Sequence, residues 1–316
     1  MRKYITILII ALLAFTLGAC GDSKDKQEDK TATKSEDTKM TIEHQLGKAD
    51  VPKNPKNVVV FDYGILDTLD KLGIDVAGVA QSSVIPKYLD KYTSDDYANI
   101  GSLKEPDFDK ISEINPDVIF ISSRQTDVYE ELNKIAPTVY LGVEPDRYME
   151  SFKENMNVIA KIFDNQDEVD EAVTAIEEHA ETLKEKVKSQ EEKALIVLSN
   201  DDQISAYGSK SRFGLIHDEF GVKAVDENIE ASTHGMTVSF EYVVEHDPDI
   251  LYVVDRSAVV GGESSAKQVV ENKLVQKTKA YKNDRIVYLD PEIWYLSGGG
   301  LVSVEKMISE IEASIK

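Results

Sequence analysis

Short runs of β-branched and other apolar residues recur along this chain, and amphipathic segments separate them. The runs are continuous, whereas strands with one solvated face alternate apolar with polar residues. We therefore predict buried parallel strands joined by helices, which is the α/β class. The predicted strands are VVVFD at 58–62, VAGVA at 76–80, VIFIS at 118–122, TVYLG at 138–142, ALIVLS at 194–199, ILYVVD at 250–255 and RIVYLD at 285–290.

Residues 167–190 contain no glycine or proline and place apolar residues three or four positions apart. This spacing predicts one long amphipathic helix. A dimerising coiled coil is the alternative, but the apolar stripe is short and rich in alanine. The helix separates the first four predicted strands from the last three, so we expect it to connect two lobes. The predicted parts are an N-terminal α/β lobe at 41–165, the connecting helix at 166–190 and a C-terminal α/β lobe at 191–316.

The start of the chain predicts export and a lipid anchor. Two basic residues precede an apolar run, and LGAC follows at 17–20. The run is short for a membrane span and typical of a secretory signal, and a small-residue site ending in cysteine is typical of bacterial lipoproteins. We predict a signal peptide at 1–19, a lipid on Cys20, a disordered polar tether at 20–40, and a position on the extracellular face of the cell membrane. Since Cys20 is the only cysteine, no disulfide is expected.

The charge and the missing motifs exclude several functions. The formal net charge of −22 argues against a nucleic-acid partner. The five histidines are scattered, and the sequence lacks the motifs of metalloproteases, phosphate-binding loops and serine hydrolases. We expect no enzyme activity, no cofactor and no protein-held metal. In so acidic a chain, a cluster of arginines is informative.

The sequence contains an internal repeat. FDKISEINPDVIFISSR at 108–124 aligns without a gap with FEYVVEHDPDILYVVDR at 240–256. Each unit predicts a short helix, a Pro-Asp turn, a buried strand and an arginine at the end of that strand. Because one unit falls in each predicted lobe, we expect the lobes to be built alike, with Arg124 and Arg256 in matching positions.

These arginines mark the predicted binding site, because ligands of open parallel sheets bind beyond the carboxyl ends of the strands. Arg212 follows the first C-terminal strand and a Gly-Ser turn, and is a third candidate. Arginine charges do not titrate at neutral pH, and with aromatic neighbours they suit a flat, anionic, aromatic ligand. The alternative to a binding role is that the arginines are merely solvated and that the aromatic side chains pack under a loop. We also expect LSGGG at 296–300 to be a flexible loop. The other candidate residues are Tyr63, Tyr207, Trp294, Tyr295, Lys87, Lys104 and His234.

Asp109 and Glu241 occupy matching positions near the starts of the two repeat helices. A carboxylate there interacts favourably with the helix dipole, which is a sufficient structural reason for it. The functional hypothesis is that one acid on each lobe docks onto basic pockets of a symmetric partner. Glu105 competes with Asp109 for this role in the N-terminal lobe.

Taken together, LGAC, the charged tether and two lobes joined by one helix resemble the solute-binding lipoproteins of Gram-positive iron–siderophore ABC importers. The resemblance covers essentially the whole chain and implies a class III periplasmic-binding-protein-like fold with two central parallel sheets. It further implies a cleft lined by Arg124, Arg212 and Arg256, and permease contacts by Glu241 and by Glu105 or Asp109. The segments closest to petrobactin and catecholate-siderophore binders are VPKNPKNVVVFDYGILDTLDKLG, GSLKEPDFDKI, KSRFGLIHD, STHGMTVSFEY and IWYLSGGGL.

The function implied is capture of a ferric catecholate-type siderophore by a monomeric, membrane-anchored receptor. The receptor would deliver the complex to an ABC permease and its ATPase, and the iron would stay inside the chelator. The long helix predicts modest lobe closure. One alternative is a haem or cobalamin receptor of the same fold, with Tyr63 or His234 as a haem ligand. The other is an exported enzyme that acts on a polyanionic substrate.

Overall fold

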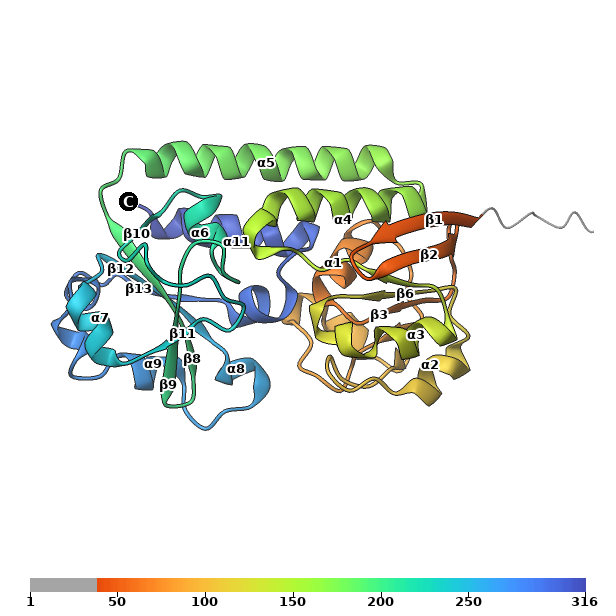
Figure 1. Ribbon diagram of the computed structural model, residues 1–316, viewed down its shortest axis with the longest axis horizontal. Helices are drawn as coiled ribbons and strands as arrows, with labels where there is room; N and C mark the ends of the chain where they lie inside the picture. The colour runs from red at the N-terminus through yellow and green to blue at the C-terminus, as the bar shows by residue number, and fades with distance from the viewer. Residues whose placement is uncertain (1–38) are drawn as a thin grey trace, which may run out of the picture. The chain divides into compact units, whose positions relative to one another are not determined.

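The computed structural model describes residues 39–316, which form one compact unit (Figure 1). The predicted signal peptide, Cys20 and nearly all of the tether lie outside the described residues. Between residues 39 and 316, no helix combines the length and the apolar character that crossing a bilayer requires.

The N-terminal lobe is built on a five-stranded parallel sheet with the strand order β5-β4-β3-β6-β7. Its central strands are fully buried, as their continuous apolar sequences predict. An antiparallel hairpin of β1 (Lys39–His44) and β2 (Gly47–Pro52) precedes it. The remaining elements are β3 (Val58–Val60), α1 (Tyr63–Lys71), β4 (Gly78–Val79), η1 (Lys87–Thr93), β5 (Ala98–Asn99), α2 (Phe108–Ile114), β6 (Val118–Ile121), η2 (Ser123–Val128), α3 (Tyr129–Ile135), β7 (Thr138–Tyr140), η3 (Pro145–Arg147) and α4 (Tyr148–Phe163).

The C-terminal lobe has a mixed sheet with the order β11-β9-β8-β12-β13, and β10 also pairs with β8. The pairs β8–β12 and β12–β13 are parallel as predicted, but β9 and β11 are antiparallel strands that we did not predict. The reason is a tight turn at Asp201, whose φ of 51° reverses the chain directly after β8. The elements are β8 (Lys193–Asn200), β9 (Gln203–Tyr207), α6 (Leu215–Asp218), β10 (Lys223–Ala224), β11 (Met236–Val238), α7 (Phe240–His246), β12 (Ile250–Asp255), α8 (Ser257–Val260), α9 (Ala266–Val270), η4 (Val275–Lys277), α10 (Lys279–Lys282), β13 (Ile286–Leu289), η5 (Glu292–Ser297) and α11 (Leu301–Ser314).

The long connecting helix is confirmed as α5 (Gln166–Lys188). Its predicted apolar stripe is buried, while the rest of its surface is largely exposed. Figure 1 shows α5 (green) running beside α4, and α5 also contacts α11. One continuous apolar core therefore includes residues of both lobes and of the helix between them.

The internal repeat is a real structural repeat. Helices α2 and α7 both end at a left-handed residue, Asn115 and Asp247, with φ of 51° and 43°. The aspartate of each following Pro-Asp pair then accepts hydrogen bonds from the backbone at the start of a neighbouring strand. The Asp117 carboxylate accepts from the Asn57 amide at 2.9 Å, and Asp249 accepts from the Lys193 amide at 3.0 Å. The repeat thus fixes the strand pairs β6–β3 and β12–β8, which places the ends of β6 and β12 alike.

The LSGGG segment is not the flexible loop that we predicted, because it is packed between α1 and α11. A Cβ atom on Gly300 would lie 2.0 Å from the Gly64 carbonyl oxygen, so only glycine allows this approach. The first amides of α11 are bound by α1: Thr68 accepts from Leu301, and the buried Asp67 carboxylate accepts from the two following residues at 3.1 and 3.0 Å. Burial raises the pKa of Asp67 to about 7.

Candidate functional site

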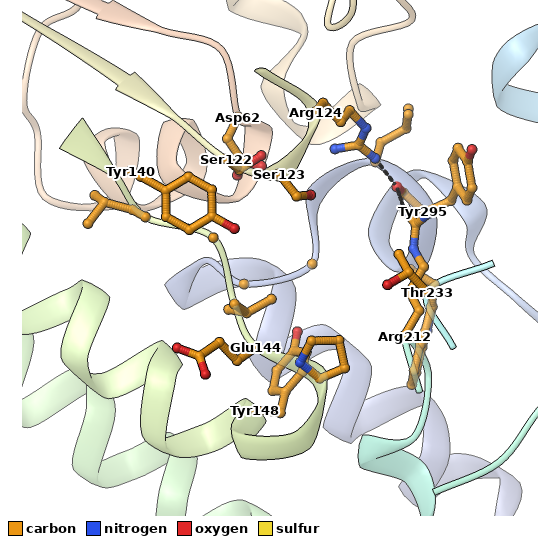
Figure 2. A pocket seen from close by; sticks show the side chains of 18 of the residues that line it. Asp62, Ser122, Ser123, Arg124, Tyr140, Glu144, Tyr148, Arg212, Thr233 and Tyr295 are labelled. Atoms are coloured by element: carbon orange, nitrogen blue, oxygen red, sulfur yellow. Dashed lines mark hydrogen bonds between the residues drawn. The ribbon is translucent and has the colours of Figure 1, made fainter. Parts of the chain in front are cut away.

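A cavity of about 520 Å³ lies at the carboxyl ends of the sheet strands and is lined by both lobes (Figure 2). The N-terminal lobe supplies residues 122–124 after β6 and residues 140–145 in and after β7. The C-terminal lobe supplies Arg212, residues 233–234 and most of the segment 294–299. This position agrees with the general rule for ligand sites in α/β sheets.

The three predicted arginines converge on Tyr295. Arg124 and Arg212 each donate from Nη2 to the Tyr295 carbonyl oxygen, at 2.6 and 2.7 Å. Arg256 donates from Nε to the Tyr295 hydroxyl at 2.8 Å. The guanidinium carbons of Arg124, Arg212 and Arg256 lie 5.9, 4.2 and 5.7 Å from the centre of the Tyr295 ring. Tyr295 is therefore the point where the charges of the two lobes meet.

Each arginine is placed by the end of a strand. Arg124 lies in η2 directly after β6, and Arg256 directly follows β12, as the repeat predicts. Arg212 lies in the turn after β9 rather than after β8, because the unpredicted antiparallel strand intervenes. Tyr295 lies in η5, a short π-helical turn, and such turns are frequent at functional sites.

The field at this point is strongly positive. Burial alone would raise the pKa of the Tyr295 phenol, but the hydrogen bond from Arg256 and the charges of Arg212, Arg256 and Arg124 outweigh it and lower that pKa. Burial and then the charge of Arg124 lower the pKa of Arg212, yet an arginine remains protonated at neutral pH. Surroundings that lower the pKa of a phenol by stabilising its negative charge also stabilise the oxygens of an anionic ligand.

Of the other predicted ligand residues, Lys104, His234 and Trp294 line the cavity. Trp294 is nevertheless buried within η5, and its Nε1 donates to Glu310 at 2.6 Å. The predicted triad needs one correction. Arg256 is absent from the cavity lining, because its Nε is bound to the Tyr295 hydroxyl; it acts on the site through Tyr295.

Tyr63, Tyr207 and Lys87 do not line the cavity. Tyr63 is buried at the start of α1 and its hydroxyl donates to the Ala80 carbonyl at 2.7 Å, so it is unavailable as a haem ligand. Tyr207 is buried against Phe213, with ring centres 4.7 Å apart. Lys87 is exposed and lies 3.7 Å from Glu292. Both tyrosines therefore pack inside the protein, which is the alternative to a ligand-binding role.

The sequence analysis did not predict several polar residues that line the cavity. The strand-end rule could have found some of them, since Asp62 follows β3, two serines follow β6, and Tyr140 ends β7. The missed lining residues with polar side chains are Gln45, Asp62, Ser122, Ser123, Tyr140, Glu144, Tyr148 and Thr233.

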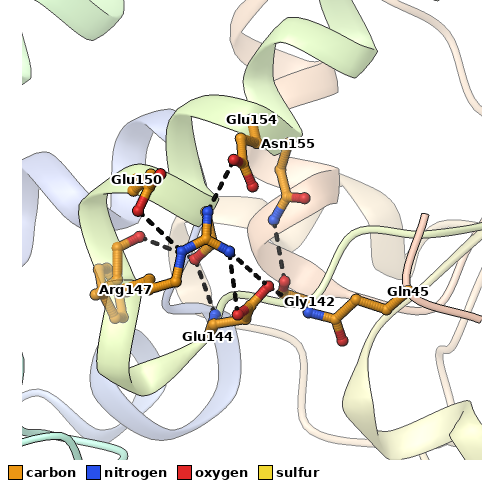
Figure 3. Close-up of polar contacts among 9 residues, drawn as sticks. Gln45, Gly142, Glu144, Arg147, Glu150, Glu154 and Asn155 are labelled. Carbon is orange, nitrogen blue, oxygen red and sulfur yellow. Dashed lines mark hydrogen bonds and ion pairs between the residues drawn. The ribbon is translucent and has the colours of Figure 1, made fainter. Parts of the chain in front are cut away.

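The loop between β7 and α4 is held by polar contacts (Figure 3). Arg147 binds the carboxylates of Glu150, Glu154 and Glu144 at 2.8, 2.9 and 3.3 Å. Gln45, from the hairpin before the sheet, donates to Glu144 at 2.5 Å. These bonds hold in place the loop that contributes residues 141–145 to the cavity lining.

Several cavity-lining side chains carry donor atoms of kinds that iron accepts: the His234 imidazole, the phenols of Tyr140, Tyr148 and Tyr295, and the carboxylates of Asp62 and Glu144. Between residues 39 and 316, no group of three or more histidine, cysteine, aspartate or glutamate residues is arranged to hold a metal ion.

The three predicted docking acids are on the surface. Glu105, Asp109 and Glu241 are exposed, and the latter two lie in the first turns of α2 and α7 as predicted. Glu105 and Asp109 border the same open surface depression of the N-terminal lobe.

Comparison with known proteins identifies the family. Residues 58–293 match the family described as periplasmic binding protein. The chain belongs to that family. It is 49% identical to the petrobactin-binding protein YclQ of Bacillus subtilis (strain 168), with 100% of each chain covered. It is 30% identical to the ferric-anguibactin-binding protein FatB of Vibrio anguillarum, covering 97% of this chain and 96% of that one.

Solved structures agree with this family. The crystal structure of the petrobactin-binding protein YclQ has a TM-score of 0.86 and 51% identity, covering 88% of this chain and 99% of its own. The periplasmic catecholate-siderophore binding protein VctP of Vibrio cholerae has a TM-score of 0.83 and 37% identity, covering 87% and 100%. The predicted two-lobe α/β fold and the family resemblance are confirmed, and these relatives are binding proteins rather than enzymes.

Proposed function

We propose that this protein captures an anionic ferric catecholate-type siderophore in the cavity and delivers it to an ABC permease. One observation carries the proposal: Arg124 of one lobe and Arg212 and Arg256 of the other meet at Tyr295 beside the cavity. A ferric catecholate complex presents anionic oxygens and flat aromatic rings. The guanidinium groups suit the oxygens, and the Tyr295 ring suits the catechol faces.

The arginines have donors left for a ligand. Among the described residues, Arg124 and Arg212 each use one side-chain N–H on Tyr295, and a guanidinium carries five. A ligand can therefore bind both arginines without displacing Tyr295. Three charge-assisted hydrogen bonds contribute about 5–9 kcal/mol, whereas nanomolar affinity needs about 12 kcal/mol. Aromatic contacts in the cavity would supply much of the difference.

Delivery to a permease is the second part of the proposal. The lipid on Cys20 would hold the protein on the extracellular face of the membrane, and the tether at 20–40 would let the two lobes reach their partner. Glu241 on one lobe, and Glu105 or Asp109 on the other, would bind basic residues of the permease. The exposure of Glu105, and that of Asp109 and Glu241 at matching helix starts, supports this arrangement.

A titration of the purified protein tests the ligand class. Trp294 is the only tryptophan of the chain and adjoins Tyr295, so its fluorescence should report binding. Ferric petrobactin and other ferric catecholates are expected to bind, and Arg212→Ala is expected to weaken them. Haem and cobalamin serve as competing ligands, because they represent the other receptor classes of this fold. Binding of haem without binding of any ferric catecholate would overturn the proposal.

A further inference from the structure

The cavity has a second wall of different chemistry, away from Arg212. It consists of Asp62, Ser122, Ser123 and Tyr140, which we call the acidic wall. Figure 2 shows these residues gathered on one side of the cavity, while Arg212 and Tyr295 lie on the other. The acidic wall thus contributes one carboxylate and three hydroxyl groups, and Arg124, the residue after Ser123, lies between it and Tyr295.

The carboxylate of Asp62 is only partly used by the protein. Asp62 is 9% exposed and caps α1: its Oδ1 accepts from the amides of Gly64 and Ile65 at 2.8 and 3.0 Å. Within residues 39–316, Oδ2 accepts no hydrogen bond and Asp62 forms no ion pair, although the residue is nine-tenths buried. Helix capping therefore explains one oxygen of this carboxylate and leaves the other open to the cavity.

The Tyr140 hydroxyl is the second unfilled polar group of this wall. Across the described part of the chain it has no hydrogen-bond partner. It lies so close to Gly142 that a Cβ atom added to that glycine would be 2.3 Å from the hydroxyl oxygen. Burial, and then the charges of Asp62 and Glu144, raise the pKa of this phenol. In the same cavity the pKa of the Tyr295 phenol is lowered. The charges that act on the Tyr140 hydroxyl are therefore those of carboxylates, whereas the charges that act on the Tyr295 hydroxyl are those of arginines.

The Asp62 carboxylate and the neighbouring hydroxyl groups determine which charge a ligand group must carry to bind at the acidic wall. An ionised carboxylate only accepts hydrogen bonds, so its open oxygen requires a donor. An anionic group would be repelled by Asp62, whereas a protonated amine brings several N–H donors and the opposite charge. The hydroxyls of Ser122, Ser123 and Tyr140 supply further acceptors around the same space.

We propose that the acidic wall binds a protonated amine of the transported ligand, with Asp62 as its counter-charge. The ligand would then carry two kinds of group: an anionic iron-chelating part at Arg124 and Arg212, and an ammonium-bearing arm at the acidic wall. This inference rests on the proposed function and specifies its substrate class.

A pair of matched ligands tests the inference. The probes are two ferric complexes of one bis-catecholate chelator, one with a free amine on its arm and one with that amine acetylated. Both are titrated at neutral pH into the full-length protein, using Trp294 fluorescence. The wild type is expected to bind the amine complex at least about tenfold more tightly, as loss of one charge-assisted hydrogen bond would predict.

The variant Asp62→Asn isolates the charge, because asparagine caps helices as well as aspartate does. It is expected to bring the affinity ratio of the two complexes close to one. Asp107→Asn is the matched control: Asp107 caps α2, accepts from the Lys110 amide at 3.0 Å and lies outside the cavity lining, so the ratio should stay at the wild-type value. Tyr140→Phe should lower the ratio in part, and it provides an independent test if Asp62→Asn does not fold.

The outcomes separate the two levels of the proposal. Equal wild-type affinity for both complexes would refute the ammonium subsite and leave the proposed function standing. An Asp62→Asn variant that weakens both complexes equally would also refute it, since Asp62 would then act as a helix cap alone. If the wild type binds neither complex nor any other ferric catecholate, the proposed function fails and takes this inference with it.

Discussion

Replacing the buried Asp67 by asparagine should change how the stability of this protein depends on pH. Asp67 joins the lobes, because it lies on α1 and accepts hydrogen bonds from the amides of Val302 and Ser303 at the start of α11. Tyr88 donates to the same carboxylate at 3.0 Å. Burial raises the pKa of Asp67 from 3.8 to about 7. That difference corresponds to about 4 kcal/mol between the protonated and the ionised forms.

The sign follows from proton binding. Between pH 3.8 and about 7 the folded protein keeps a proton on Asp67 that the unfolded chain has released. The contribution of Asp67 to stability is therefore fully present below pH 3.8 and is lost as the pH rises through about 7. Asparagine does not titrate. The free energy of unfolding of Asp67→Asn, relative to the wild type, should rise by about 4 kcal/mol across this range.

Urea unfolding at several pH values, followed by Trp294 fluorescence, measures this difference. The tryptophan is well placed because its segment leads directly into α11. Asp109→Asn, at an exposed site in the first turn of α2, is the control and should leave the pH profile nearly unchanged. Parallel stability curves for the wild type and Asp67→Asn would refute the reasoning, because the buried carboxylate would then have no raised pKa in the folded state.

Three further outcomes are expected. Arg212→Ala should weaken ferric catecholate binding by about 1.5–3 kcal/mol without unfolding the protein; unchanged affinity in a titration would remove Arg212 from the site. Glu241→Lys should leave ligand affinity intact and stop uptake by cells, and surviving uptake would disprove the docking role. Burial lowers the pKa of His179, but its hydrogen bonds to Glu312 and Glu305 outweigh this and raise it from 6.5. His179→Gln should therefore destabilise the protein by about 1 kcal/mol or less at pH 6 and not at pH 9; thermal melts that differ equally at both would contradict this.

Local patterns predicted the parts of this protein that depend on local physics. The strand predicted at 250–255 is confirmed, because its continuous apolar sequence is stable only when both faces are covered. The helix predicted at 167–190 lies within two residues of its observed ends. The repeat predicted matching units in both lobes, and its Pro-Asp turns make the same backbone contacts in each.

Side-chain direction at the strand ends could not be predicted in the same way. Tyr63 and Tyr295 both follow predicted strands, yet Tyr63 lies buried under the fold and Tyr295 reaches the cavity. The side chain of an aromatic residue after a strand can point into the core or into the cavity at similar local energy. The residues that surround it in the folded protein determine which direction it takes. Asp62 was predicted only as the last residue of a strand, and the structure alone shows that one of its oxygens caps α1 while the residue lines the cavity.

The sequence by itself therefore determined the α/β class, the connecting helix, the repeat and the strand-end positions of Arg124 and Arg256, because hydrophobic periodicity and turn chemistry act over a few residues. The tertiary structure decided that Arg124, Arg212 and Arg256 share Tyr295, although up to 171 positions separate these partners in the chain. It also decided that α1 and α11 lock together at Gly64 and Gly300. The bond of Arg124 to Tyr295 and the approach of Gly300 to Gly64 are contacts between lobes, and residues so far apart in the chain meet only once both lobes have folded and packed together.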